Sequence, residues 1–172
     1  EVIIKLYEIF GIEHIKEMIN KLDGVFSFVL YDKITKRTIV ARDPHGVRPL
    51  FFGKTKNNEI VICSEIKPIS DYCEYIEPYR PGNYSIIGHN SKNIEFINYY
   101  NYSFPVNSID TYEEIKKNVR RLLINAVDKR LMSDRPLGSL LSGGLDSSLI
   151  TALVNRHYKP YELNKDIEYS AL

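Results

Sequence analysis

The stretch that decides the fold of the C-terminal part reads Ser142-Gly143-Gly144-Leu145-Asp146-Ser147-Ser148. A short apolar run at 137–141 precedes it and predicts a strand. Apolar residues at helical spacing follow it through Val154 and predict a helix. A strand, a glycine-rich turn and a helix in this order are typical of the opening of a parallel α/β nucleotide-binding domain.

This predicted turn has the chemistry of an anion site. The first N–H groups of a helix have no partners inside the helix, and the helix dipole adds positive charge there. Gly143 and Gly144 have no Cβ, so a phosphate can approach the backbone closely, and three serine hydroxyls add donors. Asp146 would repel a phosphate, unless it orients backbone donors or holds a Mg²⁺ ion that bridges phosphates.

The simpler interpretation of the turn is a serine-capped helix after two glycines, and the strand–turn–helix context disfavours it. The phosphate loop with the pattern Gly-x4-Gly-Lys-Ser/Thr is excluded, because no lysine follows the glycines.

Upstream of the turn, Thr111 and Glu114 predict a capping box at the start of a helix. Pro136 is expected to end that helix. Its broad apolar face would comprise Ile115, Val119, Leu122, Leu123, Ala126, Val127 and Leu131. The polar segment 101–110 is expected to be a linker, with a domain boundary at residue 108.

The first hundred residues combine two helical patterns with a series of short apolar runs. The helices are expected at 2–10, ending at Gly11, and at 15–22. Strands are expected at 25–31, 38–41, 50–53, 60–64, 84–87 and 94–99. The first two strands should form a hairpin that is buried on both faces. This order of elements is an α+β pattern.

Composition excludes several classes of function. Lys plus Arg is 23 and Asp plus Glu is 22, so no basic excess points to nucleic acid or to an anionic membrane. No apolar stretch has the roughly 20 residues that a membrane span needs. Cys63 and Cys73 are expected to be free thiols of a cytoplasmic protein, and no Cys/His cluster has metal spacing.

Several motifs together resemble one family, the glutamine-hydrolysing asparagine synthetases. The motifs are 131–138 with the turn 142–148, Leu22 to Phe28, Arg42-Asp43-Pro44 with Gly46 and Arg48-Pro49-Leu50, Ser64 to Lys67, and Pro81 to Tyr84. The glutaminase motifs alone would also fit amidophosphoribosyltransferase. That enzyme has a different second domain without the 142–148 loop, so the loop favours the synthetases.

The resemblance implies a fold and a division into domains. Residues 1–108 would be the C-terminal part of an α+β sandwich of the N-terminal-nucleophile type, a glutamine amidotransferase domain. Residues 109–172 would be the start of an α/β ATP-pyrophosphatase domain. The resemblance also implies that the nucleophilic Cys, whose own α-amine acts as base, lies upstream of Glu1. The aspartate-binding segments would follow Leu172, so this chain is expected to be an inactive internal fragment.

The activity implied is that of a carbon–nitrogen ligase with glutamine as amido donor. Aspartate, glutamine, ATP and water would give asparagine, glutamate, AMP and diphosphate through a β-aspartyl-adenylate. The implied cofactors are ATP and Mg²⁺, and the implied partners are these small substrates, with a homodimer left open. The residues expected to bind ATP or pyrophosphate are Leu141, Ser142, Gly143, Gly144, Asp146, Ser147 and Ser148, and Asp146 is also the expected Mg²⁺ ligand.

Two alternatives remain open from the sequence. A relative could keep the fold and make a β-lactam or another amide, and a catalytically inactive homologue could act as a binding protein. Among the other motif residues, Arg42, Asp43 and Arg48 are expected to form a buried ion-pair and turn network rather than to touch substrate. Glu65 and Lys67 are expected at a solvated edge, and His45 in a turn without a proton-transfer role.

Overall fold

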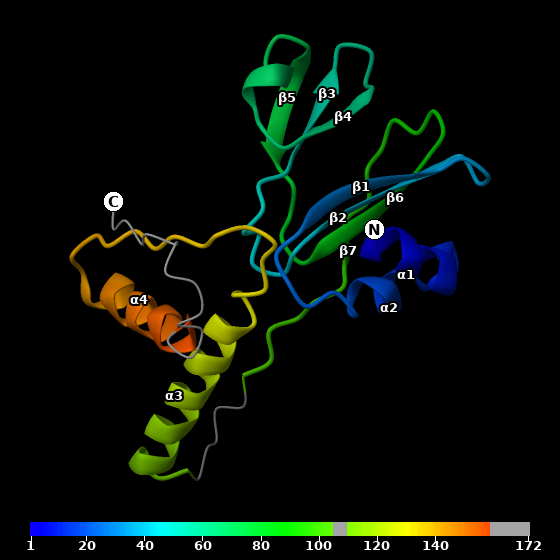
Figure 1. Cartoon of the computed structure of the whole chain (residues 1–172). Coiled ribbons are helices and arrows are strands. Elements are labelled where there is room, and N and C mark those ends of the chain that lie inside the picture. The colour runs from blue at the N-terminus through cyan, green and yellow to red at the C-terminus, as the bar shows by residue number, and fades with distance from the viewer. Residues whose placement is uncertain (105–109, 159–172) are drawn as a thin grey trace. The chain divides into compact units, whose positions relative to one another are not determined.

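The computed structural model describes residues 1–104 and 110–158. The chain divides into two compact units, residues 1–104 and residues 105–172, which we describe separately (Figure 1). The predicted domain boundary at residue 108 lies outside the described residues, as do residues 105–109 of the predicted linker.

The first unit begins with helices and continues with strands, as the sequence predicts. Helix α1 spans Val2–Phe10 and ends at Gly11, whose φ of 67° suits a glycine. A 3-10 turn, η1, at Ile12–His14 leads into the short helix α2 at Ile15–Ile19. The strands are β1 (Ser27–Asp32), β2 (Arg37–Arg42), β3 (Phe51–Thr55), β4 (Ile60–Cys63), β5 (Cys73–Pro78), β6 (Asn83–Gly88) and β7 (Ile97–Asn98), with a 3-10 turn, η2, at Lys67–Ile69.

These strands form two antiparallel sheets, which confirms the predicted α+β class. The four-stranded sheet has the order β1-β2-β6-β7, and the three-stranded sheet has the order β4-β3-β5. Helices α1 and α2 lie against one face of the four-stranded sheet (Figure 1). Successive side chains of β2 point to opposite faces of the sheet. Ile39 and Ala41 pack against the helices, and Val40 packs with Phe52 and Tyr79 on the other face.

The expectation that the first hairpin is buried on both faces is correct for β2 and wrong for β1. Strand β1 is the edge of the four-stranded sheet, and its Val29 and Tyr31 side chains are exposed. An edge strand lacks a neighbour on one side, so an apolar run does not by itself guarantee burial.

Strand β5 was not expected from the sequence, because Pro78 indicates a loop. In the structure Pro78 is the last residue of β5, opposite Phe51, where the missing N–H is tolerated. The predicted strand at 94–99 shortens to the two residues of β7.

The second unit contains two helices. Helix α3 spans Tyr112–Asp128, and Thr111 and Glu114 form the predicted capping box. The prediction that this helix continues to Pro136 is wrong: α3 ends at Asp128, where i→i−3 bonds tighten the last turn. Helix α4 spans Leu145–Tyr158, so the predicted helix is present, but it begins inside the segment 142–148 that was expected to be the turn. No helix in the described part of the chain is long and apolar enough to cross a membrane.

The prediction of a strand at residues 137–141 is also wrong. This segment is irregular, and it pairs with no strand among the described residues. An apolar run forms a strand only where a neighbouring strand pairs with its backbone groups. Without such a neighbour, the Leu140 side chain is 80% exposed. The expected strand–turn–helix unit is therefore present only as its turn and helix.

Candidate functional site

The predicted anion site is a turn that feeds directly into α4. Gly143 adopts a φ of 83°, a left-handed conformation that favours glycine. The carbonyl of Gly144 accepts the N–H of Ser148 at 3.2 Å, so α4 begins directly after this glycine. The N–H groups of the first turn of α4 therefore have no helical acceptor.

The serine hydroxyls of the turn form one connected chain of hydrogen bonds. Ser147 Oγ and Ser148 Oγ donate to the carbonyl of Gly144, at 3.0 Å and 2.9 Å. A hydroxyl has one hydrogen, so the 3.0 Å contact between Ser142 Oγ and Ser147 Oγ assigns Ser142 as its donor. Ser147 and Ser148 thus hold the start of α4, while Ser142 lies at the entry of the turn.

The backbone of the turn is open to a ligand. A Cβ atom added at Gly143 would meet nothing within 4 Å, and one at Gly144 would meet only Ser142 Oγ at 3.6 Å. Packing within the described protein therefore does not require a glycine at position 144. Of the predicted ligand-binding residues, Ser147 is half-buried and the others are exposed, Leu141 by 51%. Backbone N–H groups at a helix start can hold a phosphate group, and this turn leaves space for one.

Asp146 lies in the first turn of α4 and is exposed. The described residues contain no group of three or more His, Cys, Asp or Glu side chains that could hold a metal ion. Asp146 alone can offer a carboxylate oxygen to an ion whose other ligands are phosphate oxygens and water.

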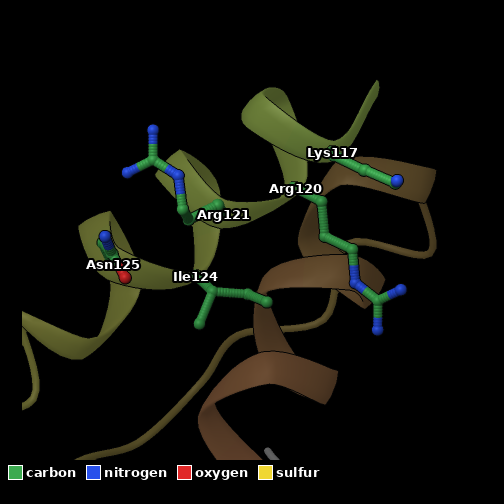
Figure 2. A pocket seen from close by; sticks show the side chains of 5 residues that line it. All are labelled: Lys117, Arg120, Arg121, Ile124 and Asn125. Atoms are coloured by element: carbon green, nitrogen blue, oxygen red, sulfur yellow. The ribbon is translucent and has the colours of Figure 1, made fainter. Parts of the chain in front are cut away.

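A hollow lies apart from this turn, on α3. It has a volume of about 260 Å³ and is lined by Lys117, Arg120, Arg121, Ile124 and Asn125 (Figure 2). Figure 2 shows the Arg120 and Arg121 side chains pointing away from each other around Ile124. Sequence reasoning missed this hollow, although cations at i, i+3 and i+4 on a helix indicate a basic face. None of the predicted ligand-binding residues lines it.

In the first unit, the Arg42–Leu50 loop is organised by Asp43. This carboxylate is 1% exposed and accepts the N–H groups of His45, Val47 and Arg48 at 3.0–3.1 Å. Burial raises the pKa of Asp43, but the backbone donors of Arg48, Val47 and His45 outweigh it and hold the pKa below its usual value.

Arg42 braces the same loop. Its guanidinium donates to the carbonyls of Arg48, Tyr79 and Gly46 at 2.6–2.8 Å. The structural role expected for this loop is present, but the expected ion pair is not: neither arginine of the loop pairs with Asp43 in the described residues. Backbone carbonyls satisfy the Arg42 guanidinium and backbone N–H groups satisfy the Asp43 carboxylate, because the tight turn brings these backbone groups next to each charge. The Arg48 side chain is exposed.

His45, Glu65 and Lys67 lie at the surface of the first unit. His45 Nδ1 is 2.9 Å from the hydroxyl of Tyr102, which also donates to the carbonyl of Pro44. This contact ties the end of the unit to the loop. Glu65 and Lys67 are exposed, as expected of a solvated edge. Cys63 and Cys73 are free and half-buried.

Two family models match the chain in succession. The glutamine amidotransferase domain model matches residues 1–85, and the asparagine synthase model matches residues 118–168. The chain is 40% identical to a probable glutamine-hydrolysing asparagine synthetase of Dictyostelium discoideum over 91% of its length. By its sequence, the chain belongs to the glutamine-hydrolysing asparagine synthetase family.

Other members of the family agree. The chain is 41% identical to glutamine-hydrolysing asparagine synthetase 1 of Arabidopsis thaliana over 91% of its length, and 36% identical to the Homo sapiens enzyme over 100%. It spans only 28%, 26% and 34% of the Dictyostelium, Arabidopsis and human relatives, respectively. The chain thus corresponds to about a third of these asparagine synthetases or less.

A solved structure resembles the chain in fold. It is titled as an allosteric regulatory enzyme of purine biosynthesis, and the likeness covers 99% of this chain and 40% of that one. The TM-score is 0.50 at 19% sequence identity, so the likeness concerns the fold alone. The family assignment rests on the sequence matches.

Proposed function

We propose that the chain is part of an ATP-dependent asparagine synthetase that uses glutamine as its amido donor. The reaction would convert aspartate, glutamine, ATP and water into asparagine, glutamate, AMP and diphosphate through a β-aspartyl-adenylate. The first unit would belong to the glutaminase domain, with the N-terminal-nucleophile fold, and residues from 109 onward to the ATP-pyrophosphatase domain.

The observation that carries the proposal is the open turn at the start of α4. It lies inside the segment that the asparagine synthase model matches, and the space beside Gly143 and Gly144 is open, with Ser142 Oγ as the nearest atom to a Cβ at Gly144. Backbone N–H groups there would hold the pyrophosphate portion of ATP. When a phosphate binds, Ser142 would turn its hydroxyl hydrogen from Ser147 Oγ to a phosphate oxygen, while Ser147 and Ser148 keep the helix start in place through the carbonyl of Gly144. Leu141 would border the adenine.

Asp146 is the residue of this chain that would hold Mg²⁺. When bound, the ion would neutralise charge on the phosphates and polarise them for displacement. The exposure of the Asp146 carboxylate, in the first turn of α4, supports this role.

The other parts of the proposal concern partners and place. The substrates would be ATP, aspartate and glutamine, with no nucleic acid or membrane partner, and the enzyme could act as a homodimer. Cytoplasmic activity is supported by the two free thiols, which are typical of a reducing compartment.

The proposal is tested by product analysis with a protein of the relatives' length that contains this chain. We expect asparagine to form only when ATP, Mg²⁺, aspartate and either glutamine or ammonia are present. A product from a different acceptor would favour a related amide- or lactam-forming synthetase. No product with any acceptor, together with unimpaired ligand binding, would favour an inactive homologue.

A further inference from the structure

We propose that the hydrogen bond between Ser139 and Thr151 is a positioning contact for the ligand-binding turn. This inference rests on the proposed function, since it concerns how residues 142–148 are held for pyrophosphate. Neither residue belongs to the turn itself. Ser139 lies three residues before Ser142, and Thr151 lies in the second turn of α4.

The contact joins the chain entering the turn to the helix leaving it. Ser139 Oγ and Thr151 Oγ1 are 2.6 Å apart, and both side chains are half-buried. Most of the surrounding segment is exposed, including Leu140 and Leu141. This hydrogen bond is therefore the best-shielded polar contact at the entry of the turn.

Within the described residues, few other contacts fix the entry segment to α4. Residues 137–141 pair with no strand of this part of the chain, so no ladder of backbone hydrogen bonds within it sets their direction. The hydroxyl contacts of the turn run between Ser142, Gly144, Ser147 and Ser148. Among the described residues, no other hydrogen bond joins 137–141 to α4.

The direction of the entry segment matters because two groups of donors must meet one ligand. One group is the backbone of Gly143 and Gly144, and the other is the first turn of α4. Rotation of the entry segment about the flexible glycines would change the spacing between the two groups. Thr151 is suited to resist this, since its β-branched side chain has few rotamers in a helix.

The test compares variants that differ only in the hydroxyl. In a protein of the relatives' length, Thr151→Val keeps the shape and removes the hydroxyl, whereas Thr151→Ser keeps the hydroxyl. We expect Thr151→Val to weaken binding of inorganic pyrophosphate, measured by calorimetry with Mg²⁺, about threefold to tenfold. The KM for ATP should rise by a similar factor, and the KM for glutamine should not change. Thr151→Ser should stay within about twofold of the parent protein.

Ser139→Ala should match Thr151→Val, and the double variant should lose no more than either single variant, because one hydrogen bond is removed in all three. Gly144→Val serves as the reference that blocks the turn directly. If Gly144→Val weakens pyrophosphate binding about tenfold or more while Thr151→Val binds like the parent protein, the positioning role is wrong and the proposed function stands. Equal losses for Thr151→Val and Thr151→Ser, or additive losses in the double variant, would also overturn it. If the parent protein does not bind pyrophosphate, the proposed function itself fails.

Discussion

Tyr7 of α1 donates its phenolic hydrogen to Oδ2 of Asp32, the last residue of β1, over 2.8 Å. Asp32 also accepts the hydroxyl of Thr35 and the N–H groups of Ile34 and Thr35, so one carboxylate closes the β1–β2 turn and ties it to the helix. Helix α1 has no fully buried residue, so this hydrogen bond supplements its half-buried contacts with the core. Within the first unit, the N-terminal helix is therefore held by both apolar packing and a polar link.

Replacing Tyr7 by Phe should lower stability in a pH-dependent way. The hydrogen bonds from Tyr7 and Thr35 lower the pKa of Asp32 to about 2, below the unfolded value of about 3.9. Burial, followed by the hydrogen bond to Asp32, raises the pKa of Tyr7 to about 12 from about 10. The contribution of the contact is thus fully present between about pH 4 and pH 10. It is lost as the pH falls from about 4 to 2, and as it rises from about 10 to 12.

The measurement is the free energy of unfolding of the parent protein and Tyr7→Phe from pH 2 to pH 12. Tyr31→Phe is the matched control, because the Tyr31 hydroxyl forms no hydrogen bond in the described part of the chain and its side chain is 49% exposed. A constant difference between parent and Tyr7→Phe at every pH would mean that the contact carries no charge-dependent stability.

Asp43→Asn should destabilise the first unit by about 2–4 kcal/mol, because hydrogen bonds to a buried charge are strong. The amide keeps one acceptor oxygen but turns an NH₂ group toward a backbone N–H donor. The lowered pKa of Asp43 means that the difference between parent and variant is complete above the unfolded pKa of about 3.9 and shrinks as the pH falls through the folded value. Urea unfolding at pH 7 and at acid pH measures both effects. Stability equal to the parent's at pH 7 would contradict the assigned role of this carboxylate.

Gly53→Ala should destabilise the three-stranded sheet. An added Cβ would lie 2.7 Å from Cys73 Sγ and 2.8 Å from the backbone oxygen of Tyr75, both on β5. Overpacking of this kind costs about 1–3 kcal/mol. Gly88→Ala is the control, since a Cβ there meets nothing within 4 Å. Thermal melting of both variants is the measurement, and a melting temperature of Gly53→Ala equal to that of Gly88→Ala would argue against the pairing of β3 with β5.

The sequence predicted local features well and tertiary ones less well. The capping box at Thr111, the end of α1 at Gly11 and the hairpin of β1 and β2 all follow from short-range chemistry and were confirmed. The missed strand β5 shows the limit, because its identity depends on a neighbour, β3, whose Gly53 leaves room for it. The strand predicted at 137–141 failed for the complementary reason, since it has no partner among the described residues.

The same distinction applies to the functional residues. The turn at 142–144 and the start of α4 could be predicted, because the glycines and the helix start are adjacent in sequence. The contact of Ser139 with Thr151 could not, since a serine and a threonine 12 residues apart carry no motif. The ion pair expected around Asp43 was wrong because sequence does not show that backbone N–H groups already satisfy the carboxylate.

We propose that the turn before α4 binds the pyrophosphate portion of ATP for amide formation. The most direct measurement is pyrophosphate release by a protein of the relatives' length, supplied with ATP, Mg²⁺, aspartate and ammonia, with glutamine hydrolysis followed in parallel. Gly144→Val should reduce the apparent affinity for ATP roughly tenfold to a hundredfold, because a side chain would fill the space of a phosphate oxygen. Asp146→Ala should lower kcat more than it raises the KM for ATP. Glutamine hydrolysis should be largely retained in both variants, and near-parental pyrophosphate release by both would contradict the account and leave the turn as a helix cap.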